Sequence, residues 1–170
     1  MCAQSRRPLT VLGYALVLAV AASGGVALAA KEGEVFKDWK TRCERSPDGS
    51  QEVCHIAQLI KDPESKRDMA QVAVGYFPAS EDPVAIVTLP LGVHLPSGLQ
   101  LQVDEGEKIR VPIEVCQPGG CQAGVNLKSP LKEAMLKGVT LKLTIHDPAG
   151  NAATLPVSLS GFTAGLGSLR

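Results

Sequence analysis

Four cysteines in two close pairs constrain this sequence more than any other feature. Cys116 and Cys121 flank a Gln-Pro-Gly-Gly stretch, and Cys43 and Cys54 bracket a Ser-Pro-Asp-Gly-Ser stretch. Proline suits the first corner of a β-turn, and glycine accepts the positive φ that many turns need. The pattern predicts two hairpins, each closed near its tip by a local disulfide.

The spacing of the cysteines supports local pairing over the other two connectivities that four cysteines allow. If the first turn centres between Asp48 and Gly49, Cys43 lies directly opposite Cys54. Opposed strand residues have Cβ atoms about 4.5–5.5 Å apart, close to the roughly 3.5–4.5 Å of a disulfide. Each bridge closes a short loop, so we expect each to stabilise the fold by about 2–3 kcal/mol.

The second hairpin carries a conflict of register. If its two cysteines oppose each other, Val115 faces Gln122, whereas the alternating apolar residues on either side of the turn require a pairing shifted by one residue. A β-bulge near Gly119-Gly120 or at Gly124 would reconcile the two registers. We therefore expect a disulfide-closed turn with a glycine bulge beside it.

The first 29 residues have the pattern of a signal peptide. Arg6 and Arg7 precede an apolar run over residues 11–20, and Ala27-Leu28-Ala29 is a small-residue cleavage site. The alternative is an uncleaved anchor over residues 10–30, which is just long enough to cross a bilayer. Glycines interrupt that run, and a twin-arginine signal matches poorly. We predict a signal peptide at 1–29 and one domain at 30–170.

Removal of the signal would also remove Cys2 and leave an even number of cysteines, with 15 lysines and arginines against 17 acidic residues. An exported chain with paired cysteines belongs in an oxidising compartment, here the periplasm or the outer envelope. The near-neutral charge argues against nucleic acid as a partner and against strong binding to anionic lipid. No membrane span is expected after cleavage.

No catalytic, metal or cofactor motif stands out. The cysteine pairs enclose ten and four residues, whereas structural zinc sites usually enclose two to four, and C-x-x-C is absent. Histidines lie scattered at His55, His94 and His146, and neither Ser158 nor Ser160 sits in a nucleophile elbow. We assign no catalytic, cofactor or metal residue and expect a protein that is not an enzyme.

Two further features have an ordinary and a functional interpretation. The acidic run at 104–107 is typical of a solvated turn; weak calcium binding is the alternative, although the run lacks EF-hand spacing. Trp39, the only tryptophan, is expected to anchor the core beside the first disulfide, with a ligand platform as the alternative.

Alternation of apolar and polar residues predicts a mainly β domain, a β-sandwich or open barrel. Pro112 and Pro156 lack an amide donor, so their strands should be edges or carry bulges, and the small Ala73 and Gly75 indicate close packing or a bulge. The expected strands are 35–43, 55–60, 69–77, 84–89, 99–103, 109–115, 139–145 and 155–159.

One or two short helices complete the expected fold. The first has Ser129 as N-cap, Pro130 as the first helical residue, Leu131–Lys137 as its body and Gly138 as its stop. Its apolar residues at 131, 134 and 135 would form a stripe over the β structure. The tail at 161–169 has similar apolar spacing and is expected to form the second helix.

Several motifs together resemble one protein family. They are Asp38-Trp39-x3-Cys43, Cys54-x3-Gln58, Leu89-Pro90-Leu91-Gly92-Val93-x-Leu95, Cys116-x3-Gly120-Cys121-x-Ala123 and the Leu-Pro-Val-Ser-Leu-Ser-Gly-Phe run at 155–162. Their order and spacing behind a signal peptide make the chain similar to the invasion-associated locus B family of alphaproteobacteria. The similarity spans nearly the whole of the expected domain.

The resemblance implies an exported periplasmic or envelope-associated protein, in a family named for a member linked to entry into host red cells. It brings no enzymatic activity, cofactor or catalytic residue. We therefore expect a domain that binds an unknown envelope or host protein, through loops 61–68 and 90–98.

Two other functions stay open. A small hydrolase would need a deep pocket joining His94 or His146 to an acidic residue and a serine or threonine. A periplasmic chaperone would need an exposed apolar groove or a free sheet edge.

Overall fold

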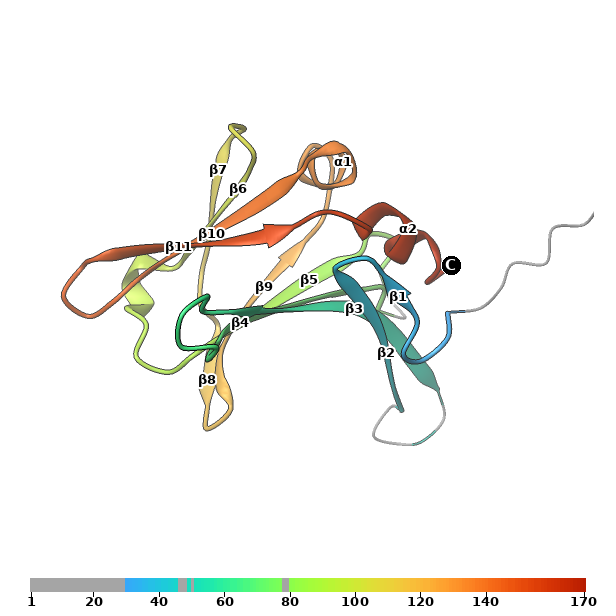
Figure 1. Cartoon of the computed structure of the whole chain (residues 1–170), viewed down its shortest axis with the longest axis horizontal. Coiled ribbons are helices and arrows are strands. Elements are labelled where there is room, and N and C mark those ends of the chain that lie inside the picture. Colours follow the sequence, from blue (N-terminus) through green and yellow to red (C-terminus); the bar gives the residue numbers. More distant parts are fainter. Residues whose placement is uncertain (1–29, 46–48, 50, 78–79) are drawn as a thin grey trace, which may run out of the picture.

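The computed structural model describes residues 30–45, 49, 51–77 and 80–170. The expected signal peptide and most of the turn between Cys43 and Cys54 lie outside these ranges. Within them, two antiparallel sheets pack face to face, as Figure 1 shows. The expected mainly β fold with two short helices and two local disulfides is confirmed, in its sandwich form.

The larger sheet has seven strands in the order β1-β2-β3-β4-β5-β9-β8. The first five follow one another in the sequence, so they form an antiparallel meander, and β9 then joins on the far side of β5 and carries β8 at the edge. The bounds are β1 Val35–Phe36, β2 Trp39–Arg45, β3 Glu52–Lys61, β4 Asp68–Gly75, β5 Val84–Leu89, β8 Val115–Gln117 and β9 Gly120–Asn126.

The smaller sheet has the order β11-β10-β6-β7. Pro156 lies in the edge strand β11, and Pro112 follows the last residue of the other edge strand, β7, as the missing amide donors predicted. The bounds are β6 Leu99–Val103, β7 Lys108–Val111, β10 Thr140–His146 and β11 Ala152–Ser158, with the 3-10 turn η1 at Leu95–Ser97 and helices α1 Leu131–Lys137 and α2 Phe162–Gly167.

The core fills the space between the two sheets. Every second side chain of a strand points into this space, because successive side chains point to opposite faces of a sheet. Trp39 of β2 is fully buried and meets Phe162 of α2 edge to face, with ring centroids 5.2 Å apart. Trp39 is therefore the core anchor that we expected. Alternate residues of the smaller sheet supply much of the rest, namely Leu99, Leu101, Val103, Leu141, Leu143, Ile145 and Val157.

Three residues tie the larger sheet to the smaller one by hydrogen bonds. The Trp39 indole and the Gln58 amide group both donate to the carbonyl of Ser158, at 2.9 and 3.0 Å, and the Ser158 amide donates to Gln58 Oε1 at 3.0 Å. All three bonds are partly buried. Because buried polar groups are costly when unpaired, this cluster fixes β11 against β2 and β3.

The stretch 35–43 differs from its prediction, since it is a tight hairpin and not one strand. Lys37 has φ 54°, and Phe36 pairs with Trp39 across the turn. The turn leaves Val35 62% exposed and lets Phe36 pack against the core instead. The odd-numbered apolar residues at 35, 39 and 43 therefore predicted a single strand where the structure has two.

The stretch 109–115 also forms two strands, and they belong to different sheets. β7 ends at the buried Val111, and after Pro112 the chain crosses to β8, where Val115 is 42% exposed. Val115 pairs with Gln122, and the Glu114 amide also donates to the Gln122 carbonyl, at 2.8 Å. Two consecutive residues facing one is the arrangement of a β-bulge.

The expected bulge does not lie at the glycines, and the conflict of register disappears because residues 108–111 pair with β6 in the smaller sheet, whereas only residues 115–117 pair with β9. Pairing of β9 with β5 runs without a shift through Gly124. Gly120 has another role: its φ is 134°, and a Cβ there would lie 2.5 Å from the Leu89 carbonyl oxygen. It allows the close approach of the hairpin to β5.

The first helix has the expected body and ends at Gly138, but its start differs. Pro130 occupies the N-cap position, and Ser129 Oγ donates to Glu133 Oε1 at 2.6 Å without capping a backbone amide. Leu131 and Met135 are buried, whereas Ala134 is exposed. The second helix is confirmed at 162–167, with Phe162 and Leu166 buried.

Candidate binding groove between the disulfide hairpins

Both disulfides close locally, between directly paired strand residues. Cys43 of β2 bonds to Cys54 of β3, and Cys116 of β8 bonds to Cys121 of β9, each with Cα atoms 4.0 Å apart. Both hairpins project from the larger sheet on the side away from the smaller sheet (Figure 1). The cross-links hold the strands of each projection together.

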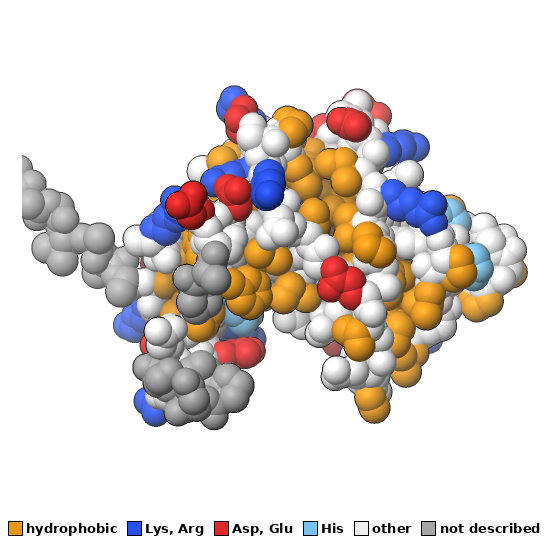
Figure 2. Space-filling view, turned by 180° about the vertical axis from the view of Figure 1, so that it is seen from behind, with side chains coloured by type: hydrophobic (Ala, Val, Ile, Leu, Met, Phe, Trp, Pro, Cys, Tyr) orange, Lys and Arg blue, Asp and Glu red, His pale blue; other side chains and the backbone are white. Residues whose placement is uncertain are grey.

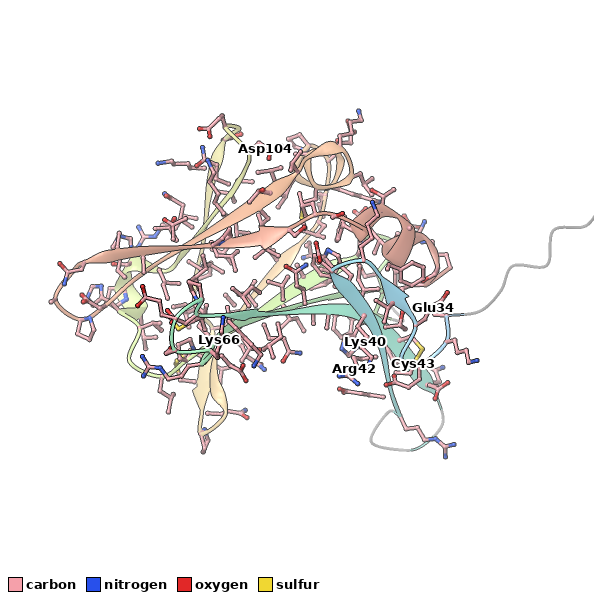
Figure 3. All side chains as sticks on the ribbon, viewed as in Figure 1. Glu34, Lys40, Arg42, Cys43, Lys66 and Asp104 are labelled. Atoms are coloured by element: carbon pink, nitrogen blue, oxygen red, sulfur yellow. A yellow bond between two sulfur atoms is a disulfide. The ribbon has the colours of Figure 1, made fainter. Side chains whose placement is uncertain are left out.

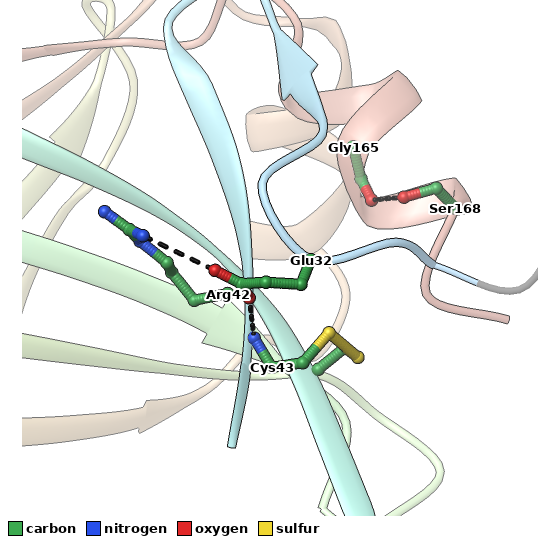
Figure 4. Close-up of a disulfide and its surroundings, with 6 residues drawn as sticks. Glu32, Arg42, Cys43, Gly165 and Ser168 are labelled. Atoms are coloured by element: carbon green, nitrogen blue, oxygen red, sulfur yellow. Dashed lines mark hydrogen bonds and ion pairs between the residues drawn. A yellow bond between two sulfur atoms is a disulfide. The ribbon is translucent and has the colours of Figure 1, made fainter.

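The first disulfide is also tied to the start of the domain (Figure 4). Glu32 accepts a hydrogen bond from the Cys43 amide through one carboxylate oxygen and meets Arg42 at 3.4 Å through the other. Glu52 lies within 4.8 Å of both sulfur atoms. Because the two sulfurs are bonded to each other, they are not thiolates and do not form a metal site with that carboxylate.

Between the two hairpins, the outer face of the larger sheet forms a groove of about 480 Å³. The groove follows β4 and β5, and Figure 2 shows the molecule hollowed between two projections on this side. Alternate residues of these strands line it, because residues of one parity share a face. They are Gln71, Ala73 and Gly75 of β4, and Val84, Ile86 and Thr88 of β5.

Small residues keep the floor of this groove low. Gly75 pairs with His55 of β3, and a Cβ on Gly75 would come within 2.9 Å of the His55 Cβ. In the next row, Ala57, Ala73 and Gly124 flank Ile86. The prediction of close packing at Ala73 and Gly75 is confirmed at Gly75, and its consequence is a hollow on the outer face.

The groove is largely apolar and carries little charge. Val53, Ala73, Val84 and Ile86 line it, and Phe77 is 45% exposed at one end. Among the described lining residues, His55 aside, only Glu44 and Arg45, neighbours on β2, are acidic or basic. Their charges are opposite, so the groove as a whole favours neither an acidic nor a basic ligand.

A sequence signal for this groove exists in β5, Val-Ala-Ile-Val-Thr-Leu. Its inward residues Ala85, Val87 and Leu89 are buried in the core, yet Val84 and Ile86 on the other side are also apolar. A strand with apolar residues on both faces is typical of a sheet covered on both sides. The described part of the chain covers only one of them.

Loop 61–68 is a charged, internally bonded turn. Asp62 Oδ1 accepts hydrogen bonds from the amides of Ser65 and Glu64, at 2.6 and 3.1 Å, and from the Ser65 hydroxyl at 2.8 Å. These bonds, chiefly the one from the Ser65 amide, stabilise the ionised carboxylate and lower the pKa of Asp62. Figure 3 places Lys66 of this loop far from Arg42 and Cys43.

Loop 90–98 is held on the smaller sheet. The His94 amide donates to the His146 carbonyl at 2.8 Å, and the Arg110 side chain donates to the carbonyl of Pro96. His94 Nδ1 lies 2.7 Å from Ser97 Oγ. A serine and a histidine are thus in contact here, but no bond from His94 to a carboxylate is present among the described residues.

The other histidine and serine candidates are not brought together. His55 lines the groove, and neither His94 nor His146 does so. Ser158 takes part in the cluster with Trp39, and Ser160 donates its amide to Ser158 Oγ at 3.2 Å. The described part of the chain therefore shows none of these serines joined to a histidine and an acid.

The acidic run at 104–107 makes structural contacts. The Asp104 carboxylate accepts hydrogen bonds from the amides of Val139 and Thr140, at 3.1 and 2.9 Å. Glu105 meets Lys142 at 2.6 Å. These carboxylates connect the β6–β7 turn to the start of β10.

Comparison with known proteins decides the family. The family model described as "Invasion associated locus B (IalB) protein" matches residues 39–170. The chain belongs to the invasion-associated locus B family. Proteins named "Invasion protein B homolog" from two strains of Brucella abortus are each 24% identical over 145 residues, which is 81% of this chain and 78% of theirs.

A solved structure of the family supports the same fold. The chain matches the crystal structure of invasion-associated protein B from Bartonella henselae with a TM-score of 0.68 and 27% identity. The match covers 80% of this chain and 92% of that one. In the part of the chain that the structure describes, no helix is long and apolar enough to cross a membrane.

Proposed function

We propose that this protein is exported to the periplasm or outer envelope and acts there by binding another protein, without catalysing a reaction. The groove between the two disulfide hairpins carries this proposal, because it is a hollowed, largely apolar surface that the described residues leave uncovered. Membership of a family named for invasion supports a role in contacts between the bacterial envelope and a host. The proposed partner is an envelope or host protein.

Export is tested first, by fractionation of cells that make the complete chain. We expect osmotic shock to release the protein with its N-terminus at Ala30, which mass spectrometry of the intact protein would show. The protein should also contain no free thiol, since all four remaining cysteines pair. Recovery of the uncleaved chain in the membrane fraction would contradict this part of the proposal.

The binding role is tested by capture of partners from envelope extract with the exported, tagged protein. We expect a partner that is retained by the native chain and lost when Ile86, in the groove, is replaced by lysine. Deletion of the gene should impair envelope integrity, stress survival or host-cell entry. Capture of nothing, together with no effect of the deletion on these three properties, would overturn the proposal.

A further inference from the structure

We propose that the groove along β4 and β5 binds a single extended polypeptide segment with uncharged, apolar side chains, as a periplasmic chaperone or escort binds a client. The inference rests on the proposed function, since it names the class of partner for the same groove. Four observations carry it: an uncovered apolar strand face, two projecting walls, a floor without charge and a polar rim.

The uncovered outer face of β5 indicates an apolar ligand. β5 lies inside the sheet, between β4 and β9, and both of its faces are apolar. Val84, Ile86 and Thr88 are only half-buried, although the chain could have carried charged residues at these outward positions without disturbing its core. Burial of such residues by a ligand is favourable at about 25 cal/mol per Å² of apolar area.

The walls decide the shape of the ligand. The β2–β3 and β8–β9 hairpins project past the floor on the same side (Figure 1), so they leave little room for a second flat sheet, such as the same face of another copy, to lie against β4 and β5. A narrow ligand lying along β4 and β5 fits between them. A groove of about 480 Å³ is large enough for a few residues of an extended chain.

The charge pattern decides the chemistry of the side chains. His55 aside, the only acidic or basic side chains among the described lining residues, Glu44 and Arg45, are opposite in sign and adjacent. Beyond the lining residues, the Glu114 carboxylate lies 3.6 Å from the Cβ position of Gly124. A charged side chain placed on the floor between them would lose its hydration and find no partner on β4 or β5.

The rim suits a polypeptide backbone. Gln71, Thr88 and Gln122 lie in one row across β4, β5 and β9, at one end of the groove. Each side chain can both donate and accept hydrogen bonds, which matches the amide and carbonyl groups of an extended chain. Each disulfide joins the two strands of one wall, and such preorganisation within the wall lowers the cost of association.

The test uses end-blocked, fluorescein-labelled octapeptides and fluorescence anisotropy with the exported protein. One peptide alternates valine and threonine, and two controls alternate lysine or glutamate with threonine. We expect the valine peptide to bind at least about tenfold more tightly than either control. Ile86→Lys should weaken that binding by at least about tenfold, because it places a charge on the floor.

A matched variant separates the groove from the rest of the face. Leu59→Lys also replaces an exposed apolar residue, 48% exposed, which pairs with Gln71 at the rim but does not itself line the groove. Its binding should stay within about twofold of the native protein. If Ile86→Lys does not fold, as judged by thermal unfolding, Thr88→Lys takes its place, since Thr88 is polar and also lines the groove.

Several results would overturn the inference. Equal binding of the charged peptides, or equal loss in Leu59→Lys and Ile86→Lys, would show that the groove does not select apolar segments. Displacement of the peptide by chitotriose or by anionic vesicles would point to a glycan or a membrane. A dimer in sedimentation that Ile86→Lys dissociates would point to a second copy.

The outcome also separates this inference from the proposed function. If the valine peptide fails to bind while native protein and Ile86→Lys capture the same envelope partner, the groove inference fails and the binding role stands. If no partner is captured by either, and no peptide binds, the proposed function fails as well.

Discussion

At the scale of single residues, several close contacts allow only one residue type. Gly161 has φ 87°, and a Cβ built there would lie 1.9 Å from the Phe36 carbonyl oxygen. The position lies directly before α2 and next to the β1–β2 turn, within the Ser-Gly-Phe run at 160–162. Both the positive φ and the close approach require glycine.

Gly161→Ala should therefore lower the free energy of unfolding by more than about 2 kcal/mol. Gly167→Ala is the matched control, because Gly167 ends the same helix and nothing lies within 4 Å of its Cβ position. The control should change stability by less than about 1 kcal/mol, in the stabilising direction. Urea unfolding measures both, and equal effects would contradict the contact with Phe36.

Position 58 should also be sensitive to substitution. The Gln58 side-chain amide donates one hydrogen bond to the backbone of Ser158 and accepts another from it. Gln58→Ala leaves the Ser158 amide without this partner and should cost about 1–3 kcal/mol in the free energy of unfolding. Gln71→Ala, at an exposed position of the neighbouring strand, should cost less than about 0.5 kcal/mol. A similar small loss for both would show that the bond contributes little.

The lowered pKa of Asp62 gives a pH dependence with a definite sign. Because the carboxyl is more acidic in the folded loop, its ionisation stabilises the loop fully above the usual value of 3.8. That stabilisation is lost as the pH falls below 3.8 and through the folded value. The amide shift of Ser65 in NMR should titrate below 3.8.

Asp62→Asn should abolish that titration. Asp147 provides the control in the same samples, since hydrogen bonds from the Asn151 side chain and amide also lower its pKa. The Asn151 amide should titrate unchanged in the variant. A Ser65 transition at or above pH 3.8 in the native protein would contradict the bonds to Asp62.

At the scale of elements, the turn chemistry and the alternation of apolar residues predicted most of the fold. Opposition of Cys43 and Cys54 followed from the turn between them, and the alternation at 99–103 and 139–145 followed from burial of one face. The breaks in 35–43 and 109–115 were missed, because a tight turn at Lys37 and a crossing at Pro112 leave the alternation almost intact.

The groove was not predicted, because sequence parity shows which residues share a face and not whether that face is covered. In the sequence, the apolar outer residues of β5 indicate a strand and nothing more. The hollow itself depends on how far two hairpins project, which is a tertiary property. The loops chosen instead, 61–68 and 90–98, are charged or tied down by internal hydrogen bonds.

The disulfides should contribute in proportion to the loops that they close. Replacing both Cys116 and Cys121 by alanine should lower the free energy of unfolding by about 2 kcal/mol, and replacing Cys43 and Cys54 by closer to 3 kcal/mol, since that loop is longer. Thermal or urea unfolding measures both. The reverse order would show that strain or residual structure outweighs loop entropy.

At the scale of the whole molecule, the protein is a sandwich in which the described residues cover the inner face of the larger sheet and leave its outer face open. The smaller sheet and α2 cover the inner face of the larger sheet, and the two disulfide hairpins flank its outer face. The core packs beneath β4 and β5, which form the floor of the groove, and the two hairpins form its walls. The hydrogen bonds from Trp39 and Gln58 to Ser158 fix the two sheets together. This arrangement presents the groove on a rigid support.

Photo-crosslinking in living cells tests groove binding most directly. A benzophenone side chain at position 86 or at position 59 is activated by light in cells that export the protein. We predict covalent polypeptide adducts from position 86 and few or none from position 59, because Ile86 lines the groove and Leu59 does not. Equal adducts from the two positions, or none from position 86, would contradict binding in the groove.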